Sequence, residues 1–354
     1  MQRAFERVLG HQGFILGAEV SAFEEEIAAF IGVPHAIGVS SGTDALLLAL
    51  SALGIGPGDE VLMPAFLFFA TAGCVARLGA RPVFVDIDPR TYNIDVELAS
   101  QRVGKATKAI IPVHLYGQTC DLGALRALSQ KHGLAMIEDA AQALGAGTAA
   151  WRAGCVGEFG CFSFFPTKNL GALGDAGLVT TRDAALAKRA RLLRAHGAEP
   201  KYHHALIGGN FRIDALQAAF LRAKLPHLTR WNSARQANAQ RYNALFAAVG
   251  LHETLLRTPA DQAGHIFHQY VIQTPYRDAL QATLKRERIG SEVYYPVPLH
   301  LQTCFAYLGE GAGSHPIAER AAREVLALPI YPELSAAQIE RVAGVVTDFL
   351  RHFR

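Results

Sequence analysis

Short apolar runs and longer amphipathic stretches alternate along the first half of the chain. The stretch Glu19–Ile31 has the spacing of an amphipathic helix and is followed by Gly32, a common helix terminator. Helical stretches such as Asp121–His132 separate apolar runs that are short enough to be buried strands. This alternation predicts an α/β fold in which a mainly parallel sheet is covered by helices. The apolar runs are Val61–Met63, Pro82–Val85, Ala109–Val113 and Leu134–Ile137.

The second half of the chain is dominated by helical patterns. Among the predicted helices are Asp183–Ala195, Asp214–Leu225 and His227–Val249, and the last is long enough to connect two domains. We therefore predict a large cofactor-binding α/β domain over residues 1–235 and a small C-terminal α+β domain over residues 236–354. The small domain would contain the segments Phe267–Thr274 and Ile289–Tyr294 and the helices Arg277–Glu287, Pro316–Ala327 and Ser335–Phe349.

Composition narrows the class of protein without indicating a function. With 354 residues, half of them hydrophobic and 18% charged, the chain can bury a sizeable core. Its net charge of +3 gives no reason to expect nucleic acid or a membrane surface as a partner. The longest apolar run, Ala65–Ala76, is too short to cross a bilayer. Five scattered cysteines without a CxxC pair, and no signal peptide, predict reduced thiols in a cytoplasmic protein.

Lys168 is the first candidate for chemistry, because it lies between an aromatic run and a glycine-rich turn. The run Phe162–Phe165 precedes it, and the turn Gly171–Gly177 follows it. A lysine in an apolar cleft loses some preference for the charged form, and a neutral amine is what a Schiff base requires. The alternative is a surface lysine whose stem packs beside a core strand, and this stretch alone favours that alternative.

Two further stretches contain groups that would suit pyridoxal phosphate. Glu138 and Asp139 follow an apolar run, at the edge where open α/β sheets bind ligands, and a carboxylate there could hold a protonated ring nitrogen. Ser41, Gly42 and Thr43 precede a helical run whose first N–H groups could hold a phosphate. Both stretches have simpler interpretations, because carboxylates and hydroxyl groups also cap helices.

Aromatic residues after the predicted strand at residues 61–63 could cover the ring of such a cofactor. Of Phe66, Phe68 and Phe69, we expect two to pack in the core and one to face the ligand. A phosphate cradle, a ring cover, a carboxylate and a lysine thus occur in one chain. Together they make Lys168 a candidate catalytic residue rather than a surface lysine.

Two other patterns suggest different chemistry but are incomplete. GAGTAA at 145–150 matches a loose dinucleotide-binding pattern, but no clear helix follows it and Glu158 comes too early for a ribose contact. A dehydrogenase is therefore disfavoured. The pair His203 and His204 suggests a metal ion, but adjacent side chains rarely chelate one ion and no further ligand cluster stands out. We expect no metal site.

The order of these segments closely resembles the DegT/DnrJ/StrS sugar aminotransferases, which are fold-type I enzymes dependent on pyridoxal phosphate. The resemblance extends from about Gly17 to Phe349, and the set of segments in this order is highly specific. The matching segments include SGTDALLLAL at 41–50, PVFVDIDPRTYNID at 82–95, IIPVHLYGQ at 110–118, IEDAAQALGA at 137–146, FPTKNLGALGDAG at 165–177, LQAAFLRAKLPHL at 216–228 and YPVPLHLQ at 295–302.

The resemblance implies a role for individual residues. Lys168 matches the lysine that forms the Schiff base, and Asp139 matches the residue that faces the pyridine nitrogen. Asn210 matches an asparagine that reaches the cofactor phosphate of the neighbouring subunit, which implies a homodimer with shared active sites. The other cofactor contacts implied are Gly42, Thr43, Phe68, Gln142 and Ser163. The substrate contacts implied are His114, Tyr116, His203, His204, Tyr295 and His300.

The reaction implied is transfer of an amino group from L-glutamate to a nucleotide-linked keto sugar, with pyridoxamine phosphate as the carrier. The loop with KYHH at 201–204 and GGNFRID at 208–214 resembles members that act on 3-keto sugars, either UDP-2-acetamido or dTDP-6-deoxy sugars. Lys168 favours transamination, because related dehydratases have histidine there. Leu67 departs from the family pattern, in which threonine is frequent. A non-catalytic regulator with the same fold is the alternative, although Lys168 and Asp139 argue against it.

Overall fold

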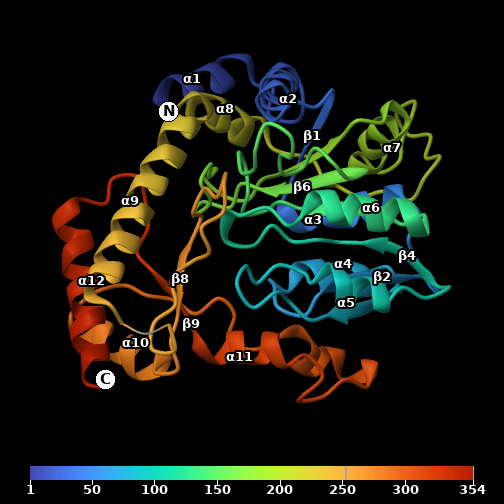
Figure 1. The fold of residues 1–354 in the computed structure, drawn as a ribbon. Helices are drawn as coiled ribbons and strands as arrows, with labels where there is room; N and C mark the ends of the chain where they lie inside the picture. The colour runs from blue at the N-terminus through green and yellow to red at the C-terminus, as the bar shows by residue number, and fades with distance from the viewer. Residues whose placement is uncertain (252, 354) are drawn as a thin grey trace.

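A seven-stranded sheet forms the centre of the computed structural model, which describes residues 1–251 and 253–353 (Figure 1). The strand order is β1-β7-β6-β5-β4-β2-β3. Strand β7 runs antiparallel to both of its neighbours, and the other pairs are parallel. The prediction of a mainly parallel sheet is therefore confirmed. Strands β1 to β7 span His35–Val39, Glu60–Pro64, Arg81–Val85, Thr107–Ile110, Ala135–Asp139, Phe159–Ser163 and Gly177–Thr181.

Helices cover both faces of the sheet, because successive side chains of a buried strand point to opposite faces. In β5, Ile137 belongs to the apolar cluster formed with α3, α4 and α7, whereas Met136 belongs to the cluster on the other face with α6. In β1, Ile37 belongs to the same cluster as Ile137, whereas Ala36 belongs to the cluster formed with α2 and α8. The helices are α1 (Gln2–His11), α2 (Ala18–Ile31), α3 (Gly42–Ala52), α4 (Ala70–Arg77), α5 (Val96–Gln101), α6 (Leu122–His132), α7 (Ala184–Arg194) and α8 (Ala215–Lys224).

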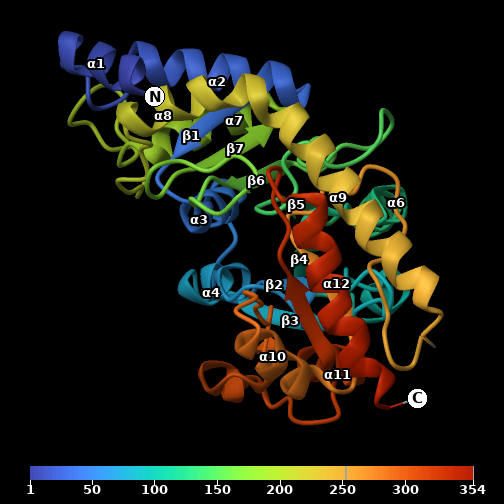
Figure 2. The ribbon, with the colours of Figure 1, turned by 90° about the vertical axis from the view of Figure 1, so that its left-hand side faces the viewer.

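The C-terminal part has an apolar core of its own around a two-stranded sheet, β8 (Tyr270–Gln273) and β9 (Val325–Leu328). Helix α9 (Leu228–Val249) runs from the large sheet to this core and lies beside α12 (Ala336–Arg351) (Figure 2). The core begins at Ala239, which supports a domain boundary near residue 236, and we keep that boundary as a proposal. The other elements are α10 (Arg277–Arg286), α11 (Pro316–Glu324) and the 3₁₀ turns Leu115–Gly117, Leu225–His227, Leu299–Leu301 and Thr303–Leu308.

Several element boundaries differ from the sequence predictions. The helix expected to reach Ala327 ends at Glu324, and the next four residues form β9. A fully buried apolar run has no polar face to reveal its period, so the pattern did not distinguish helix from strand. The segment Ile289–Tyr294, named as part of the small domain, contributes an isolated bridge between Glu292 and Ala327. Within the described residues, no helix combines the length and the apolar composition needed to cross a membrane.

Gly177 lets β7 pass close to the start of α3, and its replacement gives a test of this packing. A Cβ at position 177 would lie 2.3 Å from the backbone oxygen of Ser41, a contact that requires the backbone to move. We expect Gly177→Ala to lower the free energy of unfolding by about 1–3 kcal/mol. Gly344→Ala in α12 is the control, because a Cβ there meets nothing within 4 Å and should raise stability by about 1 kcal/mol. Urea denaturation measures both, and an unchanged midpoint for Gly177→Ala would contradict this account.

Candidate active site

A pocket of about 420 Å³ lies at the carboxyl ends of β5 and β6, next to the amino end of α3. This is the edge at which open α/β sheets bind ligands. The structure brings most of the predicted cofactor contacts together in this pocket. Those that line it are Gly42, Thr43, Phe68, Asp139, Gln142, Ser163 and Lys168, and Tyr295 from the predicted substrate contacts joins them.

Lys168 lies in the loop that follows β6, with its side chain largely enclosed by the pocket. Its backbone N–H donates to the carbonyl oxygen of Phe165 over 2.8 Å, which holds the turn. Burial lowers the pKa of Lys168 to about 8, and the carboxylate of Asp139 acts in the opposite direction. A substantial fraction of the amine is therefore neutral near physiological pH, as nucleophilic and general-base chemistry requires.

Asp139 ends β5 with its carboxylate buried and held by two hydrogen bonds. The hydroxyl of Thr71 donates to Oδ2 over 2.7 Å, and the backbone N–H of Ala141 donates to Oδ1 over 3.2 Å. Burial raises the pKa of Asp139, against the effects of the Thr71 hydrogen bond and the Lys168 charge. Among the described residues no cationic side chain bonds this carboxylate directly, so it is suited to a protonated ring nitrogen.

The amino end of α3 forms a corner of the pocket that suits a phosphate. Ser41 caps the helix, because its hydroxyl oxygen accepts the N–H of Asp44 over 3.0 Å. The carboxylate of Asp44 accepts the hydroxyl of Ser40 over 2.6 Å and is absent from the pocket lining, so it does not oppose an anion there. A Cβ on Gly42 would lie 2.8 Å from that of Ser163, so glycine permits this close approach. The arrangement matches other anion sites at helix amino termini.

Phe68 is the aromatic residue available to cover a ring. It is 58% exposed and lines the pocket, with its ring centroid 6.1 Å from that of Tyr295. Phe66 is fully buried, and Phe69 packs against Phe305 at 5.7 Å between ring centroids. Phe66 and Phe68 thus lie as expected, in the core and at the pocket, whereas Phe69 is 48% exposed and does not pack in the core.

Gln142 lies between two tyrosines at the rim of the pocket. Its Oε1 accepts the backbone N–H of Tyr116 over 2.7 Å, and its Nε2 donates to the hydroxyl of Tyr295 over 3.0 Å. Tyr116 itself is buried, and its hydroxyl donates to the backbone oxygen of Tyr294. Tyr116 is not among the residues that line this pocket, because its side chain lies behind the pocket wall, and its contact with the sugar stays a prediction.

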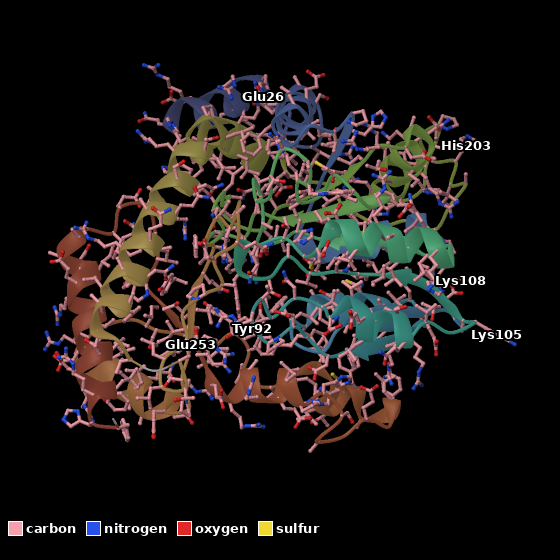
Figure 3. The ribbon with its side chains drawn as sticks, viewed as in Figure 1. Glu26, Tyr92, Lys105, Lys108, His203 and Glu253 are labelled. Carbon is pink, nitrogen blue, oxygen red and sulfur yellow. The ribbon has the colours of Figure 1, made fainter. Side chains whose placement is uncertain are left out.

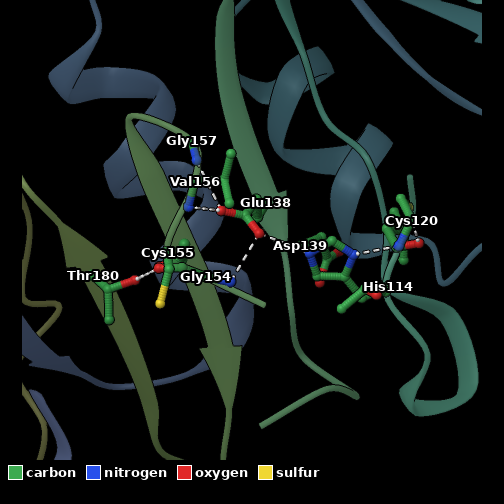
Figure 4. A network of polar contacts seen from close by, with 12 residues as sticks. His114, Cys120, Glu138, Asp139, Gly154, Cys155, Val156, Gly157 and Thr180 are labelled. Atoms are coloured by element: carbon green, nitrogen blue, oxygen red, sulfur yellow. Dashed lines mark hydrogen bonds and ion pairs between the residues drawn. The ribbon is translucent and has the colours of Figure 1, made fainter. Parts of the chain in front are cut away.

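Glu138 is a fully buried carboxylate on the face of β5 opposite Asp139 (Figure 4). Burial would raise the pKa of Glu138, but hydrogen bonds outweigh that effect and hold the pKa below its usual range. Because this carboxylate is fully engaged on the other face, it is unsuited to replace Asp139 as the partner of a ring nitrogen. Its donors are Nε2 of His114 at 2.8 Å, and the backbone N–H groups of Gly154, Val156 and Gly157 at 2.8, 2.7 and 2.8 Å.

Two histidines predicted to contact the sugar lie outside the pocket. His114 is fully buried: its Nδ1 accepts the N–H of Cys120 over 3.1 Å, so its Nε2 carries the proton shared with Glu138. His300 is also buried, with Nε2 3.1 Å from Oε1 of Glu319 and its ring beside that of His315. Neither ring lines the pocket, and the contacts of both with the sugar stay predictions. The fully buried Glu138 holds one ring and the partly buried Glu319 holds the other.

His203, His204 and Asn210 do not line the pocket of their own chain. His203 lies at the outer edge of the molecule beside α7 (Figure 3), and Nδ1 of His204 lies 2.9 Å from the backbone oxygen of His196. Asn210 is exposed. Helix α8 begins at Ala215 with Asp214 as its N-cap residue and no side-chain capping bond, so Asn210 does not cap this helix. Their implied contacts with a neighbouring subunit stay predictions.

Sequence reasoning missed several groups at the site. Thr71 holds Asp139 but comes from α4, 68 residues earlier in the chain. His268 and Tyr294 line the pocket from the segments around β8 and before the Leu299 turn. No motif surrounds these residues in the sequence. Their only local signal is that His268 and Tyr294 are polar residues within apolar segments.

The pocket fits one class of cofactor. The Lys168 amine and the Asp139 carboxylate suit a carbonyl and a cationic ring nitrogen, and the amino end of α3 suits a phosphate. Fold and pocket together define a fold-type I enzyme dependent on pyridoxal phosphate.

Comparisons with known proteins agree with this class. A profile of the DegT/DnrJ/EryC1/StrS aminotransferase family matches residues 1–347. A pleiotropic regulatory protein of Geobacillus stearothermophilus is 50% identical over 359 residues, covering 100% of this chain and 95% of the relative. A UDP-N-acetyl-3-dehydro-α-D-glucosamine 3-aminotransferase of Acidithiobacillus ferrooxidans is 48% identical over 341 residues, covering 96% and 91%.

A solved structure is equally similar along its length. Streptomyces venezuelae DesV in complex with a ketimine intermediate superposes with a TM-score of 0.95, at 41% identity, covering 99% of this chain and 94% of that one. The chain therefore belongs to the DegT/DnrJ/EryC1/StrS aminotransferase family. It is a sugar aminotransferase dependent on pyridoxal phosphate.

The lowered pKa of Lys168 gives a direct test of the site. In cofactor-free protein, acylation of Lys168 should increase through a midpoint near pH 8, because the neutral amine is the reactive form. Exposed lysines should show midpoints near pH 10.4. Asp139→Asn should move the Lys168 midpoint downward, because the carboxylate favours the ammonium form. Competitive labelling with peptide mass spectrometry measures the midpoints, and a value above 10 for Lys168 would refute its burial in the pocket.

Proposed function

We propose that this protein transfers an amino group from L-glutamate to position 3 of a nucleotide-linked keto sugar. The observation that carries the proposal is the pairing of a buried carboxylate, Asp139, with a lysine of lowered pKa in one pocket. Support for the sugar comes from the Acidithiobacillus relative, whose name gives a UDP-linked 3-keto sugar as substrate. A UDP-2-acetamido sugar is therefore our first candidate, and a dTDP-linked 6-deoxy sugar is the second.

Each residue of the pocket has a defined task in this reaction. When bound, pyridoxal phosphate supplies the electron sink that stabilises negative charge at the substrate carbon. The Lys168 amine, partly neutral near pH 8, accepts the proton that leaves this carbon and returns it to the acceptor. Asp139 keeps the ring nitrogen protonated, and Phe68 covers the ring face. The amino end of α3 and Ser163 hold the phosphate.

The proposal includes a homodimer in which each chain completes the site of the other. The loop that contains His203, His204 and Asn210 projects two large side chains into solvent, because Tyr202 is 78% exposed and Ile207 is 100% exposed. Apolar groups exposed to this degree are typical of surfaces that a partner covers. In the dimer, Asn210 would donate to the phosphate of the neighbouring cofactor, and the histidines would contact the substrate.

A regulator without catalytic activity is the second candidate, and one observation favours it. The Geobacillus relative, 50% identical to this chain, is named as a regulatory protein. However, a purely regulatory fold has no need for a lysine of lowered pKa opposite a buried carboxylate. The two candidates differ in whether the purified protein turns over a keto sugar.

The activity itself is tested with a panel of nucleotide-linked keto sugars. With glutamate as donor, we expect a mass-detected amino sugar from a 3-keto substrate and little from 4-keto isomers. Lys168→Ala should lower turnover at least about a hundredfold while the protein still folds. Borohydride reduction followed by peptide mapping should find the reduced cofactor on Lys168. Turnover of 4-keto sugars alone would refute the position of amination, and turnover by Lys168→Ala at the wild-type rate would refute the role of the lysine.

Shared active sites are tested by mixing two defective variants. Lys168→Ala lacks the base, and Asn210→Ala weakens the phosphate site of the neighbouring chain. In a heterodimer of the two, one site has both defects and the other has neither, so activity should rise above that of either parent. If each site belonged to one chain, mixing would restore nothing. Demonstrated subunit exchange without recovery would reject the shared site, and so would a monomer in sedimentation analysis.

A further inference from the structure

Three amide and imidazole side chains, two of them buried and that of Asn169 partly buried, form a hydrogen-bonded relay that ends in the cofactor pocket. Asn232 lies on α9, Asn169 directly follows the reactive lysine, and His268 precedes β8. Asn169 Nδ2 donates to Asn232 Oδ1 over 2.7 Å, and Asn169 Oδ1 lies 3.1 Å from His268 Nδ1. His268 lines the pocket together with Lys168. The relay thus joins three distant segments of the chain beside the reactive amine.

The backbone carbonyl groups around the relay determine the direction of every hydrogen bond in it. The carbonyl oxygen of Leu144 accepts Nδ2 of Asn232 over 3.2 Å, so Oδ1 of Asn232 faces Asn169. Asn169 must then present Nδ2 to Asn232, and this nitrogen also lies 3.4 Å from the carbonyl oxygen of Ile266. Oδ1 of Asn169 can only accept, so Nδ1 of His268 carries a proton and donates it. The remaining ring nitrogen of His268, Nε2, is then an acceptor.

The charges around His268 keep this nitrogen unprotonated. Burial holds the pKa of His268 well below its usual range, and the positive charges of Lys168 and Arg235 act in the same direction. Arg235 is itself buried and donates to the backbone oxygens of Phe267 and His268. The other ionisable groups that line the pocket are Asp139, Asp175, Tyr294 and Tyr295. Among the described residues, none of these four makes a hydrogen bond to the His268 ring.

We propose that His268 is a positioning residue for Lys168: with the cofactor bound and the lysine amino group released from it, Nε2 of His268 accepts a hydrogen bond from that amino group. A lysine side chain has four rotatable bonds, and a fixed acceptor at the pocket wall restricts where its amine points. The same hydrogen bond stabilises the ammonium form against the desolvation that burial imposes. His268 would therefore keep the released amine next to the substrate carbon and ready to accept its proton.

The tautomer of His268 is the first test, and it depends on neither substrate nor turnover. In holoenzyme labelled with ¹⁵N-histidine, long-range proton–nitrogen correlation should show a protonated Nδ1 and an unprotonated Nε2 for His268. Neither signal should titrate between about pH 6 and pH 9. The signals are identified by their loss in His268→Asn. A protonated Nε2, or titration near the ordinary histidine pKa of about 6.5, would overturn the proposal.

Two substitutions distinguish the role of Nε2 as acceptor from the role of Nδ1, which bonds to Asn169. In His268→Asn the side-chain amide can still donate to Asn169, as Nδ1 does, but nothing replaces Nε2. In His268→Gln the longer side chain can place an oxygen near the position of Nε2. With pyridoxamine phosphate bound, which leaves Lys168 free, the acylation midpoint of Lys168 should fall by about one pH unit in His268→Asn. It should return part of the way in His268→Gln.

The melting temperature and the kinetics complete the comparison. Both variants should melt within about 4 °C of wild type, because the relay is kept or only slightly disturbed. In His268→Asn, kcat of the glutamate half-reaction should fall while KM for glutamate changes little. In His268→Gln, kcat should fall by a smaller factor. An unchanged Lys168 midpoint in His268→Asn, or equal effects of the two substitutions, would overturn the positioning role. Because labelling and tautomer need no sugar, these results stand apart from the proposed substrate.

Asn169→Asp provides a variant that leaves the histidine in place. A carboxylate instead of the amide oxygen favours protonation of the imidazole, so His268 should begin to titrate near neutral pH. The Lys168 midpoint should then fall, because a second positive charge lies beside the amine and its acceptor is lost. If His268 gains a proton while the Lys168 midpoint stays unchanged, the two groups do not interact and the proposal fails.

Discussion

The site depends on one property of a β-strand, which is that successive side chains point to opposite faces. At the end of β5, Glu138 points to one face and Asp139 to the other. Three backbone N–H groups and His114 fix Glu138, and the backbone N–H of His114 donates to the carbonyl oxygen of Asp139 over 3.0 Å. The anchoring of one carboxylate therefore determines where the next one lies. The pocket, the lysine loop and the α3 corner are arranged around Asp139.

Burial acts on the ionisable groups of the pocket in a consistent way. It raises the pKa of Asp139 and lowers those of Lys168 and His268, so each charged form is disfavoured before a ligand enters. A cationic ring nitrogen and a phosphate would supply the charges that this enclosure lacks. The pocket is thus complementary to a cofactor that has both. The residues of the pocket would then orient the cofactor and the substrate and transfer the proton.

Function at the level of the family and function at the level of the substrate depend on different parts of the molecule. The chemistry resides on the ends of β5 and β6 and on α3, which are rigid and close to the sheet. Two of the substrate contacts that we propose, His203 and His204, belong to an exposed loop that lies away from the pocket of its own chain. Surface loops generally tolerate more sequence variation than the strands and helices that they connect. A relative named as a regulator and another named as an aminotransferase can therefore be nearly equally similar to this chain.

The amino-acid sequence by itself determined the parallel sheet and singled out Lys168 and Asp139 as the candidate catalytic pair. Asp139 ends β5 and Lys168 lies a few residues after β6, so local order along the chain is enough to place both at one edge of the sheet. Only the tertiary structure decided which neighbouring polar residues reach the pocket. His114, Tyr116 and His300 lie in matching motifs, yet hydrogen bonds to Glu138, to the backbone of Tyr294 and to Glu319 hold their side chains outside the pocket lining. Thr71, Asn169 and His268 reach the site through contacts between distant segments, and such contacts leave no periodic signal in a single sequence.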